Sequence, residues 1–359
     1  MSDEIRYGVI GTGMMGLEHI NNVNAIDGAH VVAISDPDPQ SRKFGKNTAR
    51  LEDDMVFEDH RDLLAAGVCD AVVLVSPNHT HADIMEDILA YDDLHVMVEK
   101  PLGTTVSECR RIVKAAEGHK GVVWMGLEYR YKPPIEALIH EVRSGAVGNT
   151  KMISIREHRF PFLPKVGDWN RFNRNTGGTM VEKCCHFFDL MALIAESKPV
   201  RVYASGAQDV NHLDERYNGE VPDLLDNAFV VVDFDNGIRA LLDLCMFAEG
   251  SRNEQELVVT GDVGKIESFV PEAVMRVGRR FERTVVERPV SDEHVAYHGL
   301  HEGASYLEHV DFVEAIRNGT PPKVTLEDGL LAVAIGQAAH LSIDEGRPVM
   351  MTEVLGDSA

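Results

Sequence analysis

The residues best suited to chemistry in this sequence follow a pair of glycines, Gly177-Gly178. The segment after them is predicted to be a buried helix, because it is apolar on nearly every side. Glu182, His186 and Asp189 are spaced i, i+4 and i+7 and should share one face. Buried charges without a task are costly, so this stripe indicates a site. A satisfied ion pair or buried network in the core is the alternative.

The chemistry that this stripe suggests is proton transfer from a hydroxyl group. A hydride that leaves a carbinol carbon requires the hydroxyl proton to leave too, and imidazole has a suitable pKa for accepting it. His186 is therefore the predicted general base. Glu182, one turn earlier, could orient the substrate or hold the imidazole. The neighbouring pair Cys184-Cys185 is interpreted as packing, because helix-buried thiols are commonly inert.

A glycine-rich turn near the N-terminus predicts a cofactor site. It follows a predicted strand, opens a predicted helix and has the sequence Gly11-Thr12-Gly13-Met14-Met15-Gly16. Its glycines permit a tight turn, the approach of a pyrophosphate and close helix–strand packing, and the anion would bind the free amides of the helix. A tight strand–helix turn without a ligand is the alternative.

The choice of cofactor depends on an acid beyond this turn. Asp36 follows the next predicted strand, twenty residues past Gly16, and is placed to bind both ribose hydroxyls of an adenosine. Because a carboxylate repels a 2′-phosphate, NAD is favoured over NADP. Arg42 and Lys43 lie close enough in sequence to keep NADP as an alternative.

Two further segments follow predicted parallel strands, at the edge where open α/β sheets place their ligands. After the first, Ser76, Asn78 and His81 are predicted to contact the cofactor, within a Pro-Asn turn that also caps the next helix. The second is Glu99-Lys100-Pro101, in which Glu99 and Lys100 are also predicted to contact the cofactor; an ordinary surface turn is the alternative. Lys100 in a partly dry cleft beside a positively charged nicotinamide should have a lowered pKa, bond a substrate hydroxyl and join a proton relay.

A loop rich in hydrogen-bond donors precedes the glycine pair. Such donors with an aromatic plane suit a polyhydroxylated ligand, and the loop offers Trp169, Arg171, Asn173 and Arg174. Pairing of the two arginines with surface carboxylates is the alternative.

Histidines near residue 300 are the best candidates for metal ligands. The spacing His294-x3-His298-x2-His301, with His309 beyond, is compatible with metal ligation. However, no nearby Cys or Asp pattern completes a ligand set. No metal is therefore predicted, and a loop with substrate contacts or solvent exposure is favoured.

The elements that must position these residues divide the chain in two. Residues 1–126 alternate near-continuous apolar strands with helical segments, which indicates a parallel, doubly wound sheet covered on both faces. After Gly126 a helix leads into a series of strands, with a strong hairpin signal at Asp235-Asn236-Gly237. Residues 127–359 are therefore predicted to form an α+β domain with a large, open, mainly antiparallel sheet.

Composition narrows the classes of function. The chain has 359 residues with 35 Lys and Arg against 58 Asp and Glu, a net charge of −23. Such a surface repels phosphate backbones and anionic lipid, which argues against nucleic acid and membranes as partners. With five scattered cysteines and no signal-peptide pattern, a cytoplasmic protein with reduced thiols is expected.

Together these residues resemble the Gfo/Idh/MocA oxidoreductases, a family that includes inositol and sugar dehydrogenases. The resemblance spans nearly the whole chain and rests on Gly11–Gly16, Asp36, Ser76-Pro77-Asn78-His79-Thr80-His81, Glu99-Lys100-Pro101, Trp169-Asn170-Arg171, Gly177–His186 and Thr325-Leu326-Glu327-Asp328-Gly329. It implies a Rossmann domain and an open-sheet domain whose exposed sheet face forms the oligomer contact, so a homodimer or homotetramer is expected. It also implies NAD or NADP, Lys100 as the catalytic lysine and a cis Lys100–Pro101 bond.

The sequence departs from the family pattern at one place. Members often have Asp-x3-His on the helix, whereas this chain has Glu182-x3-His186, with an unusual Lys183 directly after the glutamate. The longer carboxylate side chain implies a substrate pocket that differs from that of inositol dehydrogenase in the strict sense.

The predicted function is NAD-dependent hydride transfer from a secondary hydroxyl of a cyclic polyol or sugar, inositol-like or aldose-like. Lys100 and His186 are expected to meet across the interdomain gap beside the nicotinamide. One alternative is an NAD-dependent glycosidase that acts by transient oxidation and elimination, and another is a keto-sugar reductase that uses NADP. A non-catalytic NAD sensor is disfavoured because the lysine and the histidine are both present, and a dihydrodiol or biliverdin type of reductase is a weaker alternative.

Overall fold

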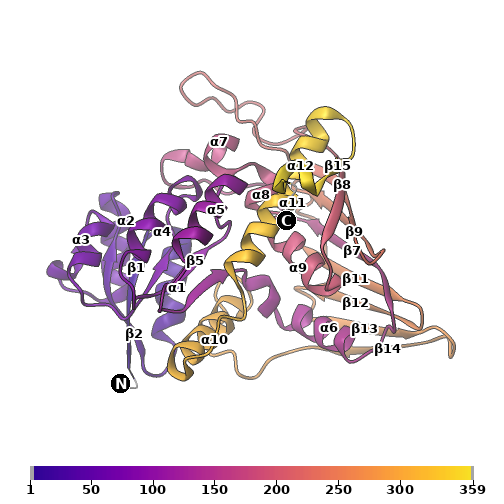
Figure 1. Ribbon diagram of the computed structural model, residues 1–359, viewed down its shortest axis with the longest axis horizontal. Coiled ribbons are helices and arrows are strands. Elements are labelled where there is room, and N and C mark those ends of the chain that lie inside the picture. Colours follow the sequence, from indigo (N-terminus) through magenta and orange to yellow (C-terminus); the bar gives the residue numbers. More distant parts are fainter. Residues whose placement is uncertain (1–3, 357–359) are drawn as a thin grey trace. The chain divides into compact units, whose positions relative to one another are not determined.

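The computed structural model describes residues 4–356, which form two compact units (Figure 1). The first unit combines three segments, Met1–Glu128, Lys165–Trp169 and Glu293–Leu330. The second combines Tyr129–Pro164, Asn170–Asp292 and Leu331–Ala359. None of the described helices has the length and apolar character needed to cross a bilayer.

The first unit is built on a six-stranded parallel sheet, as the alternation of strands and helices predicts. Its order is β3-β2-β1-β4-β5-β6, and this order reverses between β1 and β4. The strands are nearly continuously apolar because helices cover the sheet; β4, for example, is buried along its whole length. Their bounds are β1 (Ile5–Ile10), β2 (Ala29–Ser35), β3 (Val56–Phe57), β4 (Ala71–Leu74), β5 (His95–Glu99) and β6 (Val123–Gly126).

The described helices that lie wholly in this unit are α1 (Met14–Asn24), α2 (Pro39–Ala49), α3 (His60–Ala65), α4 (His81–Leu89), α5 (Val106–Ala115) and α10 (Ala304–Asn318). Local signals set several of their starts. Thr105 and Glu108 form a capping box at α5, and Asp38 caps α2. Although α10 lies far along the chain, it packs against α1, and its Phe312 contacts the buried ring of Tyr7.

The second unit is built on a nine-stranded sheet of order β14-β13-β12-β11-β7-β10-β9-β8-β15. All its strand pairs are antiparallel except β7 with β10, which confirms the predicted mainly antiparallel sheet. The strands are β7 (Thr150–His158), β8 (Pro199–Ala207), β9 (Asn227–Phe234), β10 (Arg239–Cys245), β11 (Gln255–Gly261), β12 (Gly264–Val270), β13 (Val274–Arg279), β14 (Thr284–Pro289) and β15 (Val349–Met350).

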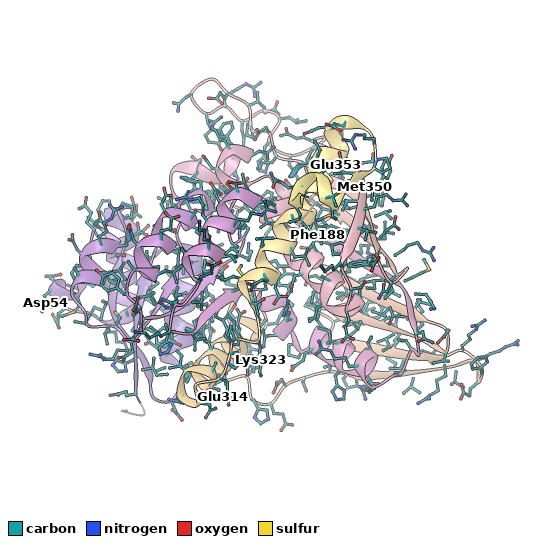
Figure 2. All side chains as sticks on the ribbon, in the orientation of Figure 1. Asp54, Phe188, Glu314, Lys323, Met350 and Glu353 are labelled. Carbon is teal, nitrogen blue, oxygen red and sulfur yellow. The ribbon has the colours of Figure 1, made fainter. Side chains whose placement is uncertain are left out.

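Burial alternates along the central strands of this sheet, as expected when one face packs on helices. Helix α6 (Pro133–Arg143) packs on β12 and β13, and α9 (Cys185–Ala195) packs on β7 (Figure 1). Phe188 on α9 is fully buried (Figure 2). The chain also forms α7 (Asn173–Thr176), α11 (Leu326–Glu345) and α12 (Met351–Leu355).

The prediction of one continuous helix after the glycine pair is wrong. The structure has two, α8 (Thr179–Glu182) and α9, which are separated at Lys183 and Cys184. The carbonyl of Thr179 accepts from the amides of both Lys183 (3.0 Å) and Cys184 (3.2 Å), so the turn is widened to an i−5 bond. Such widened turns are frequent at functional sites. Glu182 therefore ends α8, whereas His186 belongs to α9, so the two are not residues i and i+4 of one continuous helix.

Candidate active site

The predicted cofactor residues of the first unit follow the ends of four neighbouring strands. These strand ends are in register. Ile10 of β1 pairs with Ser35 of β2 and with Leu74 of β4, and Leu74 pairs with Val98 of β5. The residues that follow these positions therefore emerge at the same sheet edge, and adjacent strands lie about 4.8 Å apart. The glycine-rich turn, Asp36, the Ser76 loop and Lys100 form this row, which lies at the reversal of strand order where such folds bind ligands.

The glycine-rich turn has the geometry that a dinucleotide requires. Gly11 has a φ of +98°, and a Cβ there would lie 2.6 Å from the carbonyl oxygen of Val75. A Cβ on Gly16 would lie 2.1 Å from the Gly11 carbonyl oxygen, whereas the Cβ position of Gly13 has no described atom within 4 Å. No described side chain caps the first amides of α1. The turn therefore leaves an open approach to helix amides that suit a pyrophosphate.

Asp36 is held directly over this turn. Its Oδ2 accepts from the amide of Thr12 (2.7 Å) and its Oδ1 from the amide of Asp38 (2.8 Å). Arg42 donates to the backbone carbonyls of Asp36 (2.6 Å) and Pro37 (2.9 Å) and forms an ion pair with Glu58. The arginine that kept NADP open as an alternative is thus engaged by the protein's own carbonyls.

The loop after β4 is fastened to the loop after β5 by a histidine. His81 is buried, with Nδ1 2.8 Å from the carbonyl oxygen of Pro101 and Nε2 3.0 Å from that of Ser76. Burial lowers the pKa of His81. Both ring nitrogens thus contact main-chain carbonyls, and the ring joins the two loops. The Ser76 hydroxyl lies 2.6 Å from that of Thr80, and Asn78 is buried beside it in the same turn.

Glu99 lies in the interior beneath Lys100. Its Oε2 accepts from the amide of Lys100 (3.0 Å), and its Oε1 lies 2.8 Å from Nε2 of His19, whose Nδ1 lies 2.8 Å from Nε2 of His309. Burial alone would raise the pKa of Glu99, but the hydrogen bond and charge of His19, with Lys100 and His301, hold it well below its usual range. A buried carboxylate thus anchors the main chain of the half-buried Lys100, whose peptide bond to Pro101 is cis.

His19 and His309 were not recognised as partners in the sequence. His19 lies one turn after the glycine-rich motif, and His309 was grouped with the candidate metal ligands. Burial lowers the pKa of His309 well below its usual value. His301 instead lies near Glu128, at 3.9 Å. Within residues 4–356, no group of three histidine, cysteine or acidic side chains has the arrangement needed to hold a metal ion.

A second buried acid lies on α10. Oε1 of Glu308 accepts from the indole of Trp124 (3.2 Å) and from the amide of Leu127 (3.1 Å). Burial, with the charges of Glu128 and Glu99, raises the pKa of Glu308 well above its usual value. The folded protein therefore keeps a proton on this side chain at pH values where the unfolded chain has lost it.

This proton predicts a pH-dependent effect on stability. Because the pKa of Glu308 is higher in the folded state, its proton stabilises the fold fully at pH values below the ordinary carboxyl pKa. This stabilisation is lost as the pH rises, by up to about 1.4 kcal/mol per pH unit. Glu308→Gln, which cannot ionise, should therefore leave the melting temperature nearly unchanged near pH 4 and raise it at pH 7. Glu314→Gln, on an exposed part of the same helix (Figure 2), is the matched control and should give no such divergence. Calorimetric melts across this range test it, and parallel pH curves for both variants would refute it.

The second unit holds the predicted general base. His186 and Glu182 are both buried. The His186 ring stacks on Tyr129, with ring centroids 4.0 Å apart and planes 8° from parallel. Asp189, the third member of the predicted polar stripe, forms an ion pair with Arg130, whose Nε donates to it at 2.7 Å. For Asp189, the core ion pair is therefore what the structure shows.

The predicted substrate loop divides between the units. Trp169 belongs to the first, where its ring lies 6.3 Å from that of His79. Arg171 belongs to the second, is buried, and donates through Nε to Glu215 at 3.0 Å. The amide of Asn173 donates to Asp223 at 2.7 Å.

Arg174 forms an ion pair with Glu220 at 2.6 Å. Both arginines of this loop thus pair with carboxylates, which was the alternative to ligand binding. All five cysteines are free thiols, and burial raises the pKa of Cys184 well above its usual value, as expected for a packing residue.

The strand order, the glycine-rich turn and the carboxylate over it define a dinucleotide-binding fold with its site at the switch point. Two family models match the chain: the oxidoreductase family NAD-binding Rossmann fold over residues 5–127, and the oxidoreductase family C-terminal alpha/beta domain over residues 139–351. The chain belongs to the Gfo/Idh/MocA oxidoreductase family, and it is an NAD(P)-dependent oxidoreductase.

The chain is similar to individual relatives over nearly its full length and theirs. The chain is 29% identical to the myo-inositol 2-dehydrogenase of Thermotoga maritima over 357 residues, which cover 98% of this chain and 100% of that protein. The crystal structure of a probable dehydrogenase from Thermotoga maritima has a TM-score of 0.79 at 26% identity, covering 98% and 100% of the two chains. Levoglucosan dehydrogenase, solved with NADH and levoglucosan, has a TM-score of 0.84 at 19% identity, covering 97% and 99%, and shares the fold.

Proposed function

We propose that this protein oxidises a secondary hydroxyl group of a cyclic polyol or sugar and transfers the hydride to NAD. The observation that carries the proposal is the register of the first unit, which brings Lys100 to the same sheet edge as the glycine-rich turn and Asp36. A relative named myo-inositol 2-dehydrogenase supports a polyol substrate. The reverse reaction, reduction of a keto-sugar, uses the same residues.

Each side chain has a distinct task in this proposal. Bound NAD supplies the hydride acceptor. The ammonium of Lys100, anchored through its amide to buried Glu99, donates a hydrogen bond to the substrate hydroxyl and holds it in place. An imidazole nitrogen of His186 accepts the hydroxyl proton. Glu182, next to the widened turn, orients the substrate, and Trp169 offers an aromatic plane to a sugar ring.

The environment of Asp36 supports NAD as the cofactor. The carboxylate accepts from the Thr12 amide over the turn, and this position supports an interaction with a ribose and repulsion of a 2′-phosphate. Asp36→Ala should therefore raise the dissociation constant of NAD about tenfold or more, since hydrogen bonds to a charged group are lost. The dissociation constant of NADP should change less, because repulsion is removed at the same time.

Calorimetric titration of both cofactors measures this difference. Asp38→Ala is the matched control, because it removes a neighbouring carboxylate that caps α2 through the amide of Ser41. It should affect both cofactors equally. Equal changes for NAD and NADP in Asp36→Ala would contradict the choice of NAD.

A substrate screen tests the function itself. Inositols, aldoses and their keto forms are offered with NAD and with NADP, and formation or consumption of the reduced cofactor is followed by absorbance. Net reduction of NAD by a cyclic polyol or sugar is the expected result. Glycoside cleavage without net NADH would instead support the NAD-dependent glycosidase. No redox change with any of these compounds would refute the proposal.

A further inference from the structure

Tyr129, on which the His186 ring stacks, is itself held by an unusual set of buried charges. Tyr129 stacks flat against the imidazole, and its hydroxyl accepts from Nζ of Lys183 at 2.8 Å. The same ammonium lies 2.8 Å from Oε1 of Glu157, which is completely buried on β7. Lys183 is the residue that departs from the family pattern and that marks the break between α8 and α9.

Further contacts lead from Glu157 back to the ring of Tyr129. The second carboxylate oxygen of Glu157 accepts from Gln255 at 2.8 Å, and Gln255 accepts from Nζ of Lys132 at 3.0 Å. That Nζ lies over the Tyr129 ring, 4.4 Å from its centroid. All five residues are buried. One ammonium thus fixes the hydroxyl of Tyr129 and another contacts its ring.

Ordinary core packing does not account for such an arrangement. Two ammonium groups and a carboxylate, which the half-buried Arg159 also approaches at 3.5 Å, lose hydration when they are buried, and apolar side chains of similar size are often at least as stable. This network of contacts gives the Tyr129 ring a defined position, because both its hydroxyl and its ring are held. The imidazole stacked on that ring therefore keeps a fixed plane.

We propose that Tyr129 is a positioning residue for His186 and that Lys183 and Glu157 hold it in place. The proposal rests on His186 being the general base of the proposed function. It assigns a task to Lys183, because the cation that interrupts the helix is the one that fixes the hydroxyl of Tyr129. The Tyr129 ring, held by Lys183 and Glu157, is thus a platform for the imidazole. Without this platform the imidazole is present but poorly oriented for proton transfer.

The test compares variants that remove the platform in steps. Tyr129→Leu removes the stack and Tyr129→Phe removes only the hydroxyl. Lys183→Met removes the ammonium, and Lys183→Met/Glu157→Gln keeps the charge balanced if the single variant fails to fold. Phe188→Leu is the control, because it removes a fully buried ring from the same helix, α9.

We expect kcat to fall in the variants that disturb the platform, and the size of the loss should not depend on how much each variant lowers the stability of the protein. Tyr129→Leu should lower kcat about tenfold or more, because small displacements of reacting groups are costly. The solvent deuterium isotope effect on kcat should rise as proton transfer becomes limiting, while the dissociation constant of NAD stays constant. Tyr129→Phe and Lys183→Met should lose less, in the same direction. An unchanged isotope effect with kcat losses equal to that of Phe188→Leu would overturn the proposal.

A second readout does not need activity. Because the His186 ring protons lie over an aromatic face, their nuclear magnetic resonances should be displaced by the Tyr129 ring current. Tyr129→Leu should abolish this displacement and Lys183→Met should reduce it. If no substrate is oxidised by the unmodified protein, the proposed function fails, while a reduced displacement in Lys183→Met still supports the platform. A displacement that Lys183→Met leaves unchanged would overturn it.

Discussion

Lys100→Met should lower turnover at least about a hundredfold while NAD binding is largely retained. The methionine keeps the length of the side chain but removes the ammonium that we propose to bond the substrate hydroxyl. The anchor beneath it, Glu99 on the Lys100 amide, involves the main chain and is retained. Affinity for NAD should hold because the glycine-rich turn and Asp36 are unchanged.

The measurement combines steady-state turnover with calorimetric titration of NAD. Lys120→Met is the matched control, because it removes the same charge from an exposed lysine that pairs with Asp92. Its turnover should equal that of the unmodified protein. Turnover of Lys100→Met within about threefold of the unmodified enzyme would remove Lys100 from the chemistry, since a group in the transition state contributes more.

Replacement of His186 should have an effect of similar size for a different reason. His186→Phe keeps an aromatic ring stacked on Tyr129 but has no nitrogen to accept a proton, so kcat should fall about a hundredfold. Because the packing is retained, this loss separates proton transfer from stability. The pH profile should also lose the limb that reports protonation of the base.

His140→Ala provides the comparison for this second prediction, since it removes an exposed imidazole from α6. Melting temperatures of both variants show whether folding is intact. If His186→Phe retains its pH profile and most of its turnover, another group accepts the proton and the mechanism is wrong.

The Rossmann fold of the first unit could be predicted from the sequence because its signals are local. The glycine-rich turn needs close backbone approaches that only glycine permits, and Asp36 follows the next strand at a fixed distance along the chain. The strand order then places both on one edge with Lys100. Short-range rules of turns and parallel strands are sufficient for this part of the fold.

The interior partners could not be predicted, because they are remote in sequence. Glu99 was expected to contact the cofactor, yet its side chain is directed to His19, eighty residues earlier, which in turn contacts His309. Such pairings depend on which helix faces meet, and periodicity alone does not fix that. Lys183 was visible as a departure from a family pattern, but its partner Glu157 lies on a strand of another segment.

The break between α8 and α9 has the same origin. Periodicity predicts a continuous helix there, because the apolar residues continue without interruption from Met180 to Ile194 apart from the polar stripe and Lys183. Tertiary contacts of one buried ammonium accompany the change from helix to widened turn. Helix propensity is a weak signal when a charge must find partners in the core.

The membership of α10 in the first unit has a consequence for the order of synthesis. The ribosome completes β1 to β6 long before it reaches Phe312 and His309, which contact Tyr7 and His19 in the finished unit. Until then the nascent Rossmann half leaves part of its interior uncovered. Completion of the Rossmann half therefore waits until β7 to β14 of the second unit have also been made, because these strands lie between β6 and α10 in the chain.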